Sequence, residues 1–201
     1  MLRVGLTGGL ACGKSFVGEA LAGLGCLVIR ADELGHQVLA RDGEAYDKVV
    51  AEFGPGILSA GGEIDRSALA SKVFGDAERL ARLNSIVHPL VIRREEEAAT
   101  RFAEREPHGI AVVEAAILIE TGSYKRFDRI ILVTCREEQQ LERAMRREGV
   151  SETDARARLS RQMPFEKKRE FADFVIDTSG EKSDTLRQTR EVFEALRRIE
   201  L

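Results

Sequence analysis

The sequence predicts an α/β fold in which a parallel five-stranded sheet is flanked by helices. Five short apolar runs lack polar alternation, which is typical of parallel strands that are buried on both faces. Between these runs, apolar residues recur at helical spacing. A glycine-rich segment joins the first apolar run to the first helical segment. This order of strand, glycine loop and helix favours a fold that binds phosphate groups.

The predicted strands cover residues 2–7, 26–29, 109–113, 128–133 and 173–177. About eighty residues separate the second run from the third, which is too long for one crossover helix, so we expect a helical insertion there. Asp76 is placed to cap a long helix within it that continues past Pro89. A closing helix is expected over 183–199, with its apolar side chains on one face.

A second helical segment, over 137–171, is expected to form a lid. Ser151 begins a capping box within this segment. Basic residues are dense in it: Arg143, Arg146, Arg147, Arg156, Arg158, Arg161, Lys167, Lys168 and Arg169. The charge pattern alone also fits a solvated helical pair. In a phosphate-transfer enzyme, however, such arginines stabilise charge on the transferred group. The expected organisation is one domain with a core (1–32, 108–136 and 172–201), an insertion (33–107) and a lid (137–171).

Residues 8–15 fit the phosphate-binding pattern G-x-x-x-x-G-K-[ST]. Glycines let the backbone curl so that its N–H groups point at phosphates, and the following helix adds its N-terminal dipole. Lys14 is expected to reach the β- and γ-phosphates of ATP, and the Ser15 hydroxyl to hold Mg²⁺. The expected nucleotide-binding residues are Gly8, Gly9, Ala11, Cys12, Gly13, Lys14, Ser15 and Phe16. An ordinary glycine-rich turn is the weaker alternative, because the flanking strand and helix match what the motif needs.

Three further residues are candidates for chemistry. Asp32 follows the second strand, where ligands bind in open parallel sheets, and a carboxylate there can accept a hydroxyl proton. Its spacing fits equally well with an N-cap of a helix over 33–39. Glu114 ends the third strand, where an acidic residue can orient Mg²⁺, and spacing favours it slightly over Glu120. His88 precedes a proline, so it is either a donor to a substrate phosphate or part of a helix kink.

Composition excludes several classes of protein. Charged residues make up 32% of the chain, with both signs mixed and a net charge of −3, which gives no reason to expect a nucleic-acid partner. No apolar run is long enough for a membrane span, and no secretory leader is evident. The three cysteines are far apart and lack metal-ligand spacing. A reducing cytoplasm is the simplest compartment for such a chain. A monomer or small homo-oligomer is expected.

Six segments together resemble the dephospho-coenzyme A kinase family over nearly the whole chain. They cover residues 6–15, 28–32, 83–90, 114–120, 143–147 and 172–177, and the run at 143–147 is similar to the start of the family's lid. The His-Pro-Leu run and the Ala-Asp-Phe-Val-Ile-Asp run are far more specific than the phosphate loop. The resemblance implies a P-loop NTPase kinase core, a helical coenzyme A-binding insertion and a lid. The implied reaction joins ATP and 3′-dephospho-coenzyme A, with Mg²⁺, to give ADP and coenzyme A.

The resemblance also implies roles for individual residues. Asp32 would be the general base on the ribose 3′-hydroxyl, and Arg143 would be the lid arginine that contacts the phosphates. Lys14 would act on the transferred phosphate, and Glu114 would lie beside Mg²⁺ through water. His88 would lie in the substrate region. The chain departs from the family pattern at three positions: Arg30 replaces an aspartate, Ala116 a proline and Phe16 a threonine.

Three other functions are weaker alternatives for this sequence. The nearest alternative is another small-molecule or nucleoside monophosphate kinase of the same core, which the run at 83–90 disfavours. A GTP-binding switch would need an Asn-Lys-x-Asp motif, and the sequence has none. A nucleotide-sensing module without catalysis would tolerate the loss of Asp32, whereas a kinase should not.

Overall fold

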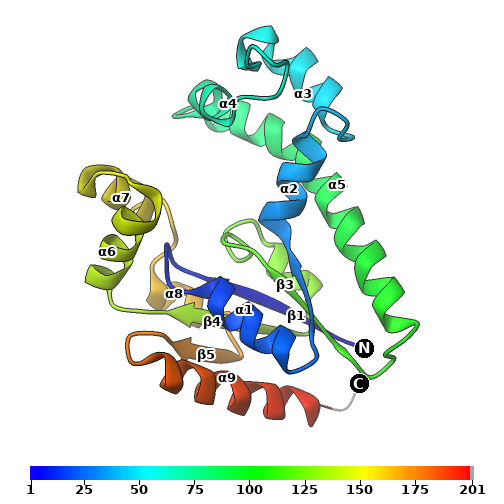
Figure 1. Ribbon diagram of the computed structural model, residues 1–201, viewed down its shortest axis with the longest axis vertical. Helices are drawn as coiled ribbons and strands as arrows, with labels where there is room; N and C mark the ends of the chain where they lie inside the picture. The colour runs from blue at the N-terminus through cyan, green and yellow to red at the C-terminus, as the bar shows by residue number, and fades with distance from the viewer. Residues whose placement is uncertain (200–201) are drawn as a thin grey trace. The chain divides into compact units, whose positions relative to one another are not determined.

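The computed structural model describes residues 1–199 (Figure 1). The chain divides into two compact units. The first combines Met1–Ile29 with the chain from Ala99 onward, and the second is Arg30–Ala98. The second unit therefore contains most of the segment expected as the insertion, and the segment expected as the lid belongs to the first unit. The roles given to these two segments stay predictions.

The first unit is built on a parallel five-stranded sheet, as the apolar runs predict. Its strands are β1 (Leu2–Gly8), β2 (Leu27–Arg30), β3 (Ile110–Glu114), β4 (Arg129–Thr134) and β5 (Phe174–Asp177). Their order is β2-β3-β1-β4-β5, so β1 is central. Leu6 lies opposite Glu114 on one side and Ile131 on the other. The carboxyl ends of β3 and β4 are therefore brought beside the loop that leaves β1.

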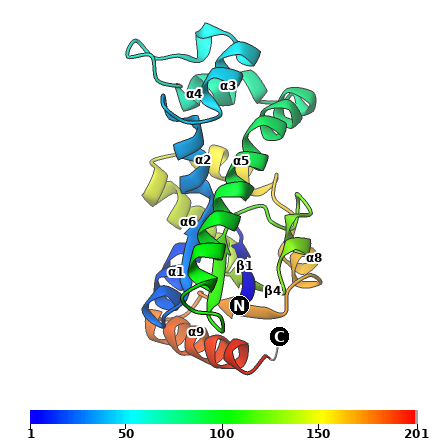
Figure 2. The ribbon, with the colours of Figure 1, turned by 90° about the vertical axis from the view of Figure 1, so that its right-hand side faces the viewer.

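Helices cover both faces of this sheet. α1 (Lys14–Gly23) and α9 (Lys182–Arg197) lie on one face, and the short α8 (Phe165–Arg169) lies against β4 on the other (Figure 2). Alternate residues of β1 pack against α1 and α9 because side chains of a strand point to opposite faces in turn. The core on that face includes Leu2, Val4, Leu6, Val17, Leu21, Val192, Phe193 and Leu196. The closing helix is thus confirmed.

The segment from β4 to β5 is helical, as expected. It contains α6 (Glu137–Glu148), α7 (Glu152–Leu159) and α8, and η2 (Ser123–Arg126) precedes β4. Ser151 caps α7 by accepting a hydrogen bond from the Asp154 N–H at 3.1 Å, so the predicted helix start is confirmed.

The second unit is helical, with α2 (Ala31–Leu39), α3 (Tyr46–Phe53), η1 (Pro55–Ile57), α4 (Arg66–Val73) and α5 (Ala77–Ala103), which ends in the first unit. Val38, Val49 and Ile57 are fully buried in its own core. Asp76 caps α5, because its Oδ1 accepts a hydrogen bond from the Arg79 N–H at 3.0 Å. As expected, α5 continues through Pro89.

The interpretation of Asp32 as a helix cap is wrong. α2 begins at Ala31, one residue before Asp32, and its N-cap is Arg30, which makes no side-chain cap hydrogen bond. The helix follows β2 without a connecting loop, so Asp32 lies inside the first turn. Its side chain is exposed.

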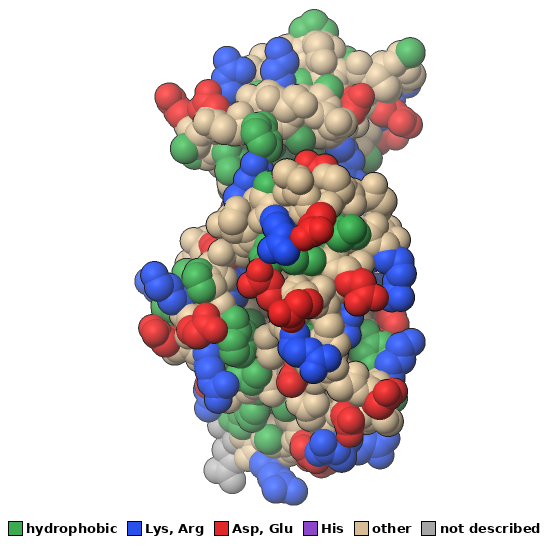
Figure 3. Space-filling view, turned by 90° about the vertical axis from the view of Figure 1, so that its left-hand side faces the viewer, with side chains coloured by type: hydrophobic (Ala, Val, Ile, Leu, Met, Phe, Trp, Pro, Cys, Tyr) green, Lys and Arg blue, Asp and Glu red, His purple; other side chains and the backbone are tan. Residues whose placement is uncertain are grey.

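Two surface properties bear on possible partners. On the face in Figure 3, basic and acidic side chains are interspersed, with no large area of one sign. Within residues 1–199, no helix combines the length and the apolar character that a membrane crossing requires.

Substitution of Ile131 tests how much the buried side chains of the central strands contribute to stability. Its side chain is fully buried in β4, so Ile131→Ala is expected to lower the free energy of unfolding by about 2–5 kcal/mol. Leu186→Ala is the control, because Leu186 on α9 is 46% exposed and its loss should cost no more than about 0.5 kcal/mol. Urea unfolding followed by circular dichroism measures both. Equal losses in the two variants would contradict the assignment of the core.

Candidate active site

The phosphate-binding loop, residues 8–15, leaves the carboxyl end of β1. Gly8 must be a glycine, because a Cβ there would lie 2.3 Å from the carbonyl oxygen of Val133 on β4. Gly13 precedes α1 with φ +84°, in the left-handed region that favours glycine. Ala11 has φ +50°, a conformation that costs an L-residue about 1–2 kcal/mol. Such strain is typical of loops whose backbone is shaped for a ligand.

Lys14 folds back over this loop. Its Nζ donates hydrogen bonds to the carbonyl oxygens of Gly8, at 3.4 Å, and Gly9, at 3.2 Å. The ammonium group is therefore held beside the curled backbone and the N-terminus of α1. Together these groups form a concentrated positive field, which suits a polyphosphate.

Ser15 and Glu114 meet next to the loop. The Ser15 hydroxyl, in the first turn of α1, donates a 2.8 Å hydrogen bond to Oε1 of Glu114, the last residue of β3. Glu114 is buried, with 7% of its surface exposed. The structure thus brings together the two residues that the sequence nominated for Mg²⁺, although they are 99 positions apart.

The donor atoms of this pair suit Mg²⁺. A hydroxyl and a carboxylate are hard oxygen ligands, and Mg²⁺ in nucleotide sites usually takes only one or two protein oxygens besides phosphates and water. Among residues 1–199 there is no cluster of three or more His, Cys, Asp or Glu side chains that could hold a metal without such help. The metal roles of Ser15 and Glu114 stay predictions.

Arg143 contacts the loop through Thr178. From α6, its guanidinium donates to the Thr178 hydroxyl at 3.2 Å and to the Thr178 carbonyl at 2.9 Å. The Thr178 hydroxyl in turn donates to the carbonyl oxygen of Cys12 at 2.8 Å. Sequence reasoning missed Thr178. Thr178 directly follows the run at 172–177, and this position next to a distinctive run is the one sequence feature that could have identified it as a site residue.

Phe16, which the sequence nominated for nucleotide contact, is half-buried in α1. The Nζ of Lys182 lies 5.7 Å from the centroid of its ring, within the range of a cation–π interaction. This contact ties the start of α9 to the first turn of α1. No hydroxyl follows Ser15 at this position.

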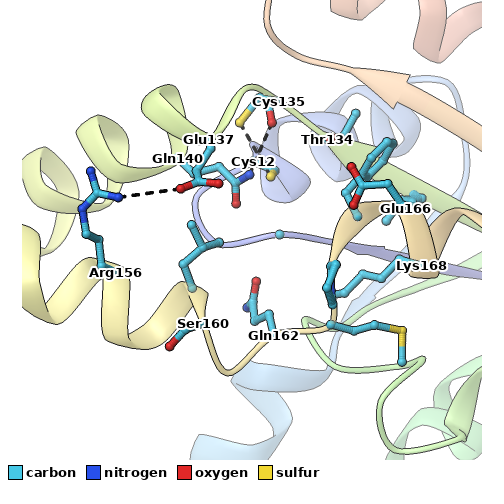
Figure 4. Close-up of a pocket in the computed structure, with 16 residues that line it drawn as sticks. Cys12, Thr134, Cys135, Glu137, Gln140, Arg156, Ser160, Gln162, Glu166 and Lys168 are labelled. Carbon is cyan, nitrogen blue, oxygen red and sulfur yellow. Dashed lines mark hydrogen bonds and ion pairs between the residues drawn. The ribbon is translucent and has the colours of Figure 1, made fainter.

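A cavity of about 580 Å³ adjoins the loop within the first unit (Figure 4). Its wall includes Gly9 and Cys12 of the loop, Thr134 at the end of β4, Cys135 directly after it, Arg156 of α7 and Lys168 of α8. Arg156 makes ion pairs with Glu152 at 2.8 Å and with Glu137 at 3.7 Å. Polar and charged side chains therefore enclose a space directly beside the phosphate loop.

Lys168 is a structural cation and not an exposed residue of the lid. Only 2% of its side chain is exposed, and its Nζ lies 2.8 Å from Oε1 of Glu120. The same oxygen accepts a hydrogen bond from the Met163 N–H at 3.2 Å. Sequence reasoning grouped Lys168 with the lid cations because charge density does not reveal burial. Glu120 therefore ties the segment after β3 to the segment after α7.

Asp32 and His88 belong to the second unit, whereas the loop, Glu114 and Arg143 belong to the first. Asp32 is exposed in the first turn of α2. His88 is half-buried in α5, and this burial lowers the pKa of its imidazole. Since the ordinary value is about 6.5, His88 is uncharged at neutral pH and can donate one neutral hydrogen bond.

The second unit also carries a groove of about 560 Å³ between α3 and α5. Lys48 and Arg82 line it together with Ser85 and Pro89 from the run at 83–90. Arg82 is paired with Glu52, with 3.0 Å between Nε and Oε2. Residues of this distinctive run thus form part of a polar recess.

Comparison with known proteins gives a consistent result. The family model for dephospho-CoA kinase matches residues 2–184. The dephospho-CoA kinase of Aquifex aeolicus is 40% identical over 198 residues, covering 98% of this chain and 99% of that protein. That of Geobacillus kaustophilus is 40% identical over 190 residues, covering 93% and 92%.

Solved structures agree with these sequence matches. TT1252 from Thermus thermophilus superposes with a TM-score of 0.83 at 31% identity, covering 96% of each chain. Dephospho-CoA kinase from Campylobacter jejuni gives 0.68 at 28% identity, also covering 96% of each. A shikimate kinase from Bacteroides thetaiotaomicron, with a TM-score of 0.53 at 12% identity, shares the fold alone.

The buried ion pair between Lys168 and Glu120 can be compared with an exposed ion pair of the same length between Arg187 and Glu191. Glu120→Ala leaves the ammonium of Lys168 buried without its carboxylate, so a loss of about 3–5 kcal/mol in unfolding free energy is expected. Glu191→Ala breaks an Arg187 pair with the same 2.8 Å separation, but both of its side chains are about 60% exposed. That loss should be at most about 1 kcal/mol. Urea unfolding compares them, and a Glu120→Ala loss no larger than the control would exclude a structural tie.

Proposed function

The chain belongs to the dephospho-CoA kinase family, and on this basis we propose that it transfers the γ-phosphate of ATP to the ribose 3′-hydroxyl of 3′-dephospho-coenzyme A. The products are ADP and coenzyme A. The observation that carries this proposal is the strained loop at 8–15, with Lys14 folded over it and Ser15 hydrogen-bonded to Glu114. A preformed polyphosphate site beside an oxygen-ligand pair is what phosphoryl transfer from ATP requires.

The loop binds the triphosphate of ATP in this proposal. Backbone N–H groups of residues 9–15 and the N-terminus of α1 surround the β-phosphate, and Lys14 exchanges its carbonyl partners for phosphate oxygens. Ser15 and Glu114 would hold Mg²⁺, with Glu114 acting through water, and the metal would supply positive charge that neutralises the phosphates.

Asp32 is the proposed general base. Its carboxylate accepts the proton of the 3′-hydroxyl as that oxygen attacks the γ-phosphorus. Two observations support this role. Asp32 follows β2, at the sheet edge where ligands of open parallel sheets bind, and it is exposed without serving as a helix cap. Arg30 stands where the family has an aspartate, so Asp32 is the one carboxylate of positions 30 and 32. Arg30 pairs with Glu33 at 3.6 Å.

The second unit is proposed to hold the acceptor. Dephospho-coenzyme A carries a pyrophosphate, and Lys48 supplies positive charge along the groove between α3 and α5, where the charge of Arg82 is balanced by Glu52. His88, kept neutral by burial, is suited to donating a hydrogen bond to the substrate without adding charge. These assignments give residues 30–98 the substrate role that the resemblance implies for the insertion.

Arg143 is proposed to stabilise negative charge on the transferred group. Its guanidinium already points to Thr178, which contacts the phosphate loop through the Cys12 carbonyl. An arginine anchored in this way loses little freedom when it binds phosphate oxygens.

The three cysteines are free thiols, which supports a reducing, cytoplasmic setting for the enzyme.

The proposed reaction is tested by comparing ADP release with different phosphate acceptors. Purified protein with Mg-ATP is expected to release ADP with dephospho-coenzyme A, but only at a background rate with AMP, with shikimate or without an acceptor. Mass spectrometry of the product should show one added phosphate on the ribose. Lys14→Met is the matched loss-of-function control. Release of ADP with AMP at an equal or higher rate would favour a nucleoside monophosphate kinase instead.

Asp32→Asn isolates the proposed base. The substitution keeps the size of the side chain but removes its ability to accept the proton, so kcat should fall by about 10²–10⁴-fold. ATP affinity, measured by calorimetry, should stay close to that of the unmodified chain. Glu33→Gln is the control, because Glu33 is an exposed carboxylate in the same helical turn, and its kcat should be nearly unchanged. Near-normal turnover of Asp32→Asn would reject the base role.

A further inference from the structure

Two cysteine thiols meet beneath the phosphate loop. The sulfur of Cys12 in the loop lies 3.6 Å from the sulfur of Cys135, which directly follows β4. Both side chains are buried, with 1% and 7% of their surfaces exposed. The pair forms because β1 and β4 are neighbours, with Gly8 opposite Val133, so the segments that leave these strands stay together. Neither thiol has a part in the proposed phosphoryl transfer.

The cavity beside the loop borders this pair. Cys12 and Cys135 both line it, and in Figure 4 they lie next to each other at its wall. The cavity of about 580 Å³ is large enough for water-sized and somewhat larger solutes. Cys135, with 7% of its surface exposed, is the more accessible of the two lining residues, and Cys12, at 1%, lies behind it.

The surroundings make one thiol reactive and the other a resolving partner. A hydrogen bond with Cys12 is the largest cause that lowers the pKa of Cys135, to about 7. Burial and the Asp177 charge raise this pKa, and the Arg143 charge and the Thr178 hydroxyl lower it. The hydrogen bond with Cys135 and burial raise the pKa of Cys12. Burial raises the pKa of the third cysteine, Cys26, to about 12. Because the thiolate is the nucleophile, Cys135 should react first and Cys26 should stay inert.

We propose that Cys12 and Cys135 form an oxidation site at which a hydroperoxide closes a disulfide that disables the phosphate loop. The Cys135 thiolate attacks one peroxide oxygen, the O–O bond breaks, and a sulfenic acid and hydroxide form. The Cys12 sulfur then attacks the Cys135 sulfur, an S–S bond forms and water leaves. Hydrogen peroxide is thereby reduced to two water molecules, and the two thiols lose two electrons and two protons.

The disulfide would reshape the loop because the sulfurs must move closer. They are 3.6 Å apart as thiols, and a disulfide requires about 2.05 Å. Cys12 lies between Ala11, at φ +50°, and Gly13, at φ +84°, so its displacement disturbs the two left-handed residues that set the loop. The Thr178 hydrogen bond to the Cys12 carbonyl would also be disturbed. The loss of ATP binding rests on the proposed function, whereas disulfide formation does not.

Hydrogen peroxide is the probe for the unmodified chain. After treatment, denaturation and thiol titration, the count of free thiols should fall from three to one. Intact mass should decrease by two hydrogen atoms, and peptide mapping should link Cys12 to Cys135. Calorimetry should show most ATP affinity lost, and dithiothreitol should restore it. Three titratable thiols after treatment, or a mapped link that leaves ATP affinity intact, would overturn the proposal.

Two variants separate this site from general oxidation. Cys135→Ser should keep basal ATP affinity and retain it in peroxide, whereas Cys26→Ser should lose it as the unmodified chain does. Loss of ATP affinity in Cys135→Ser at the rate of the unmodified chain would overturn the proposal. If the link forms and abolishes ATP binding but dephospho-coenzyme A is not phosphorylated, the oxidation site stands and the proposed function fails.

Discussion

The pairing of β1 with strands on both of its sides is the constraint on which the site depends. Because Gly8 has no side chain, the end of β1 approaches the backbone of β4 closely at Val133. On the other side, the register with β3 places Leu6 opposite Glu114. The phosphate loop therefore begins between two fixed strand ends. One supplies a carboxylate next to Ser15, and the other supplies the thiol next to Cys12.

The loop is also held from outside the sheet by polar contacts of a few side chains. Thr178 follows β5 and bonds to the Cys12 carbonyl, while Arg143 of α6 holds Thr178. Glu120 and Lys168 fix the segments that enclose the neighbouring cavity. A buried ion pair contributes little net stability compared with apolar packing, but it penalises any arrangement that separates its members. Such contacts suit a site that must keep one geometry.

The same packing explains why a cysteine in the loop matters. In a loop whose backbone amides bind the ligand, a side chain is free to point away from the phosphates. In this chain, the Cys12 side chain meets a second thiol in the core of the first unit. A bond formed at the Cys12 sulfur would therefore change the backbone conformation of the phosphate loop, although the Cys12 side chain takes no direct part in phosphoryl transfer.

The sequence by itself determined the elements and the motif. The five apolar runs are strands within one residue of their predicted bounds, and Asp76 and Ser151 cap the helices they were expected to cap. These features depend on local periodicity, local hydrogen bonds and glycine sterics, all of which can be read along the chain. Only the tertiary structure decided that Ser15 meets Glu114, that Lys168 is buried against Glu120, and that Cys12 faces Cys135. Each of these contacts joins distant segments through strand order and packing, and no local pattern encodes the distance between two side chains.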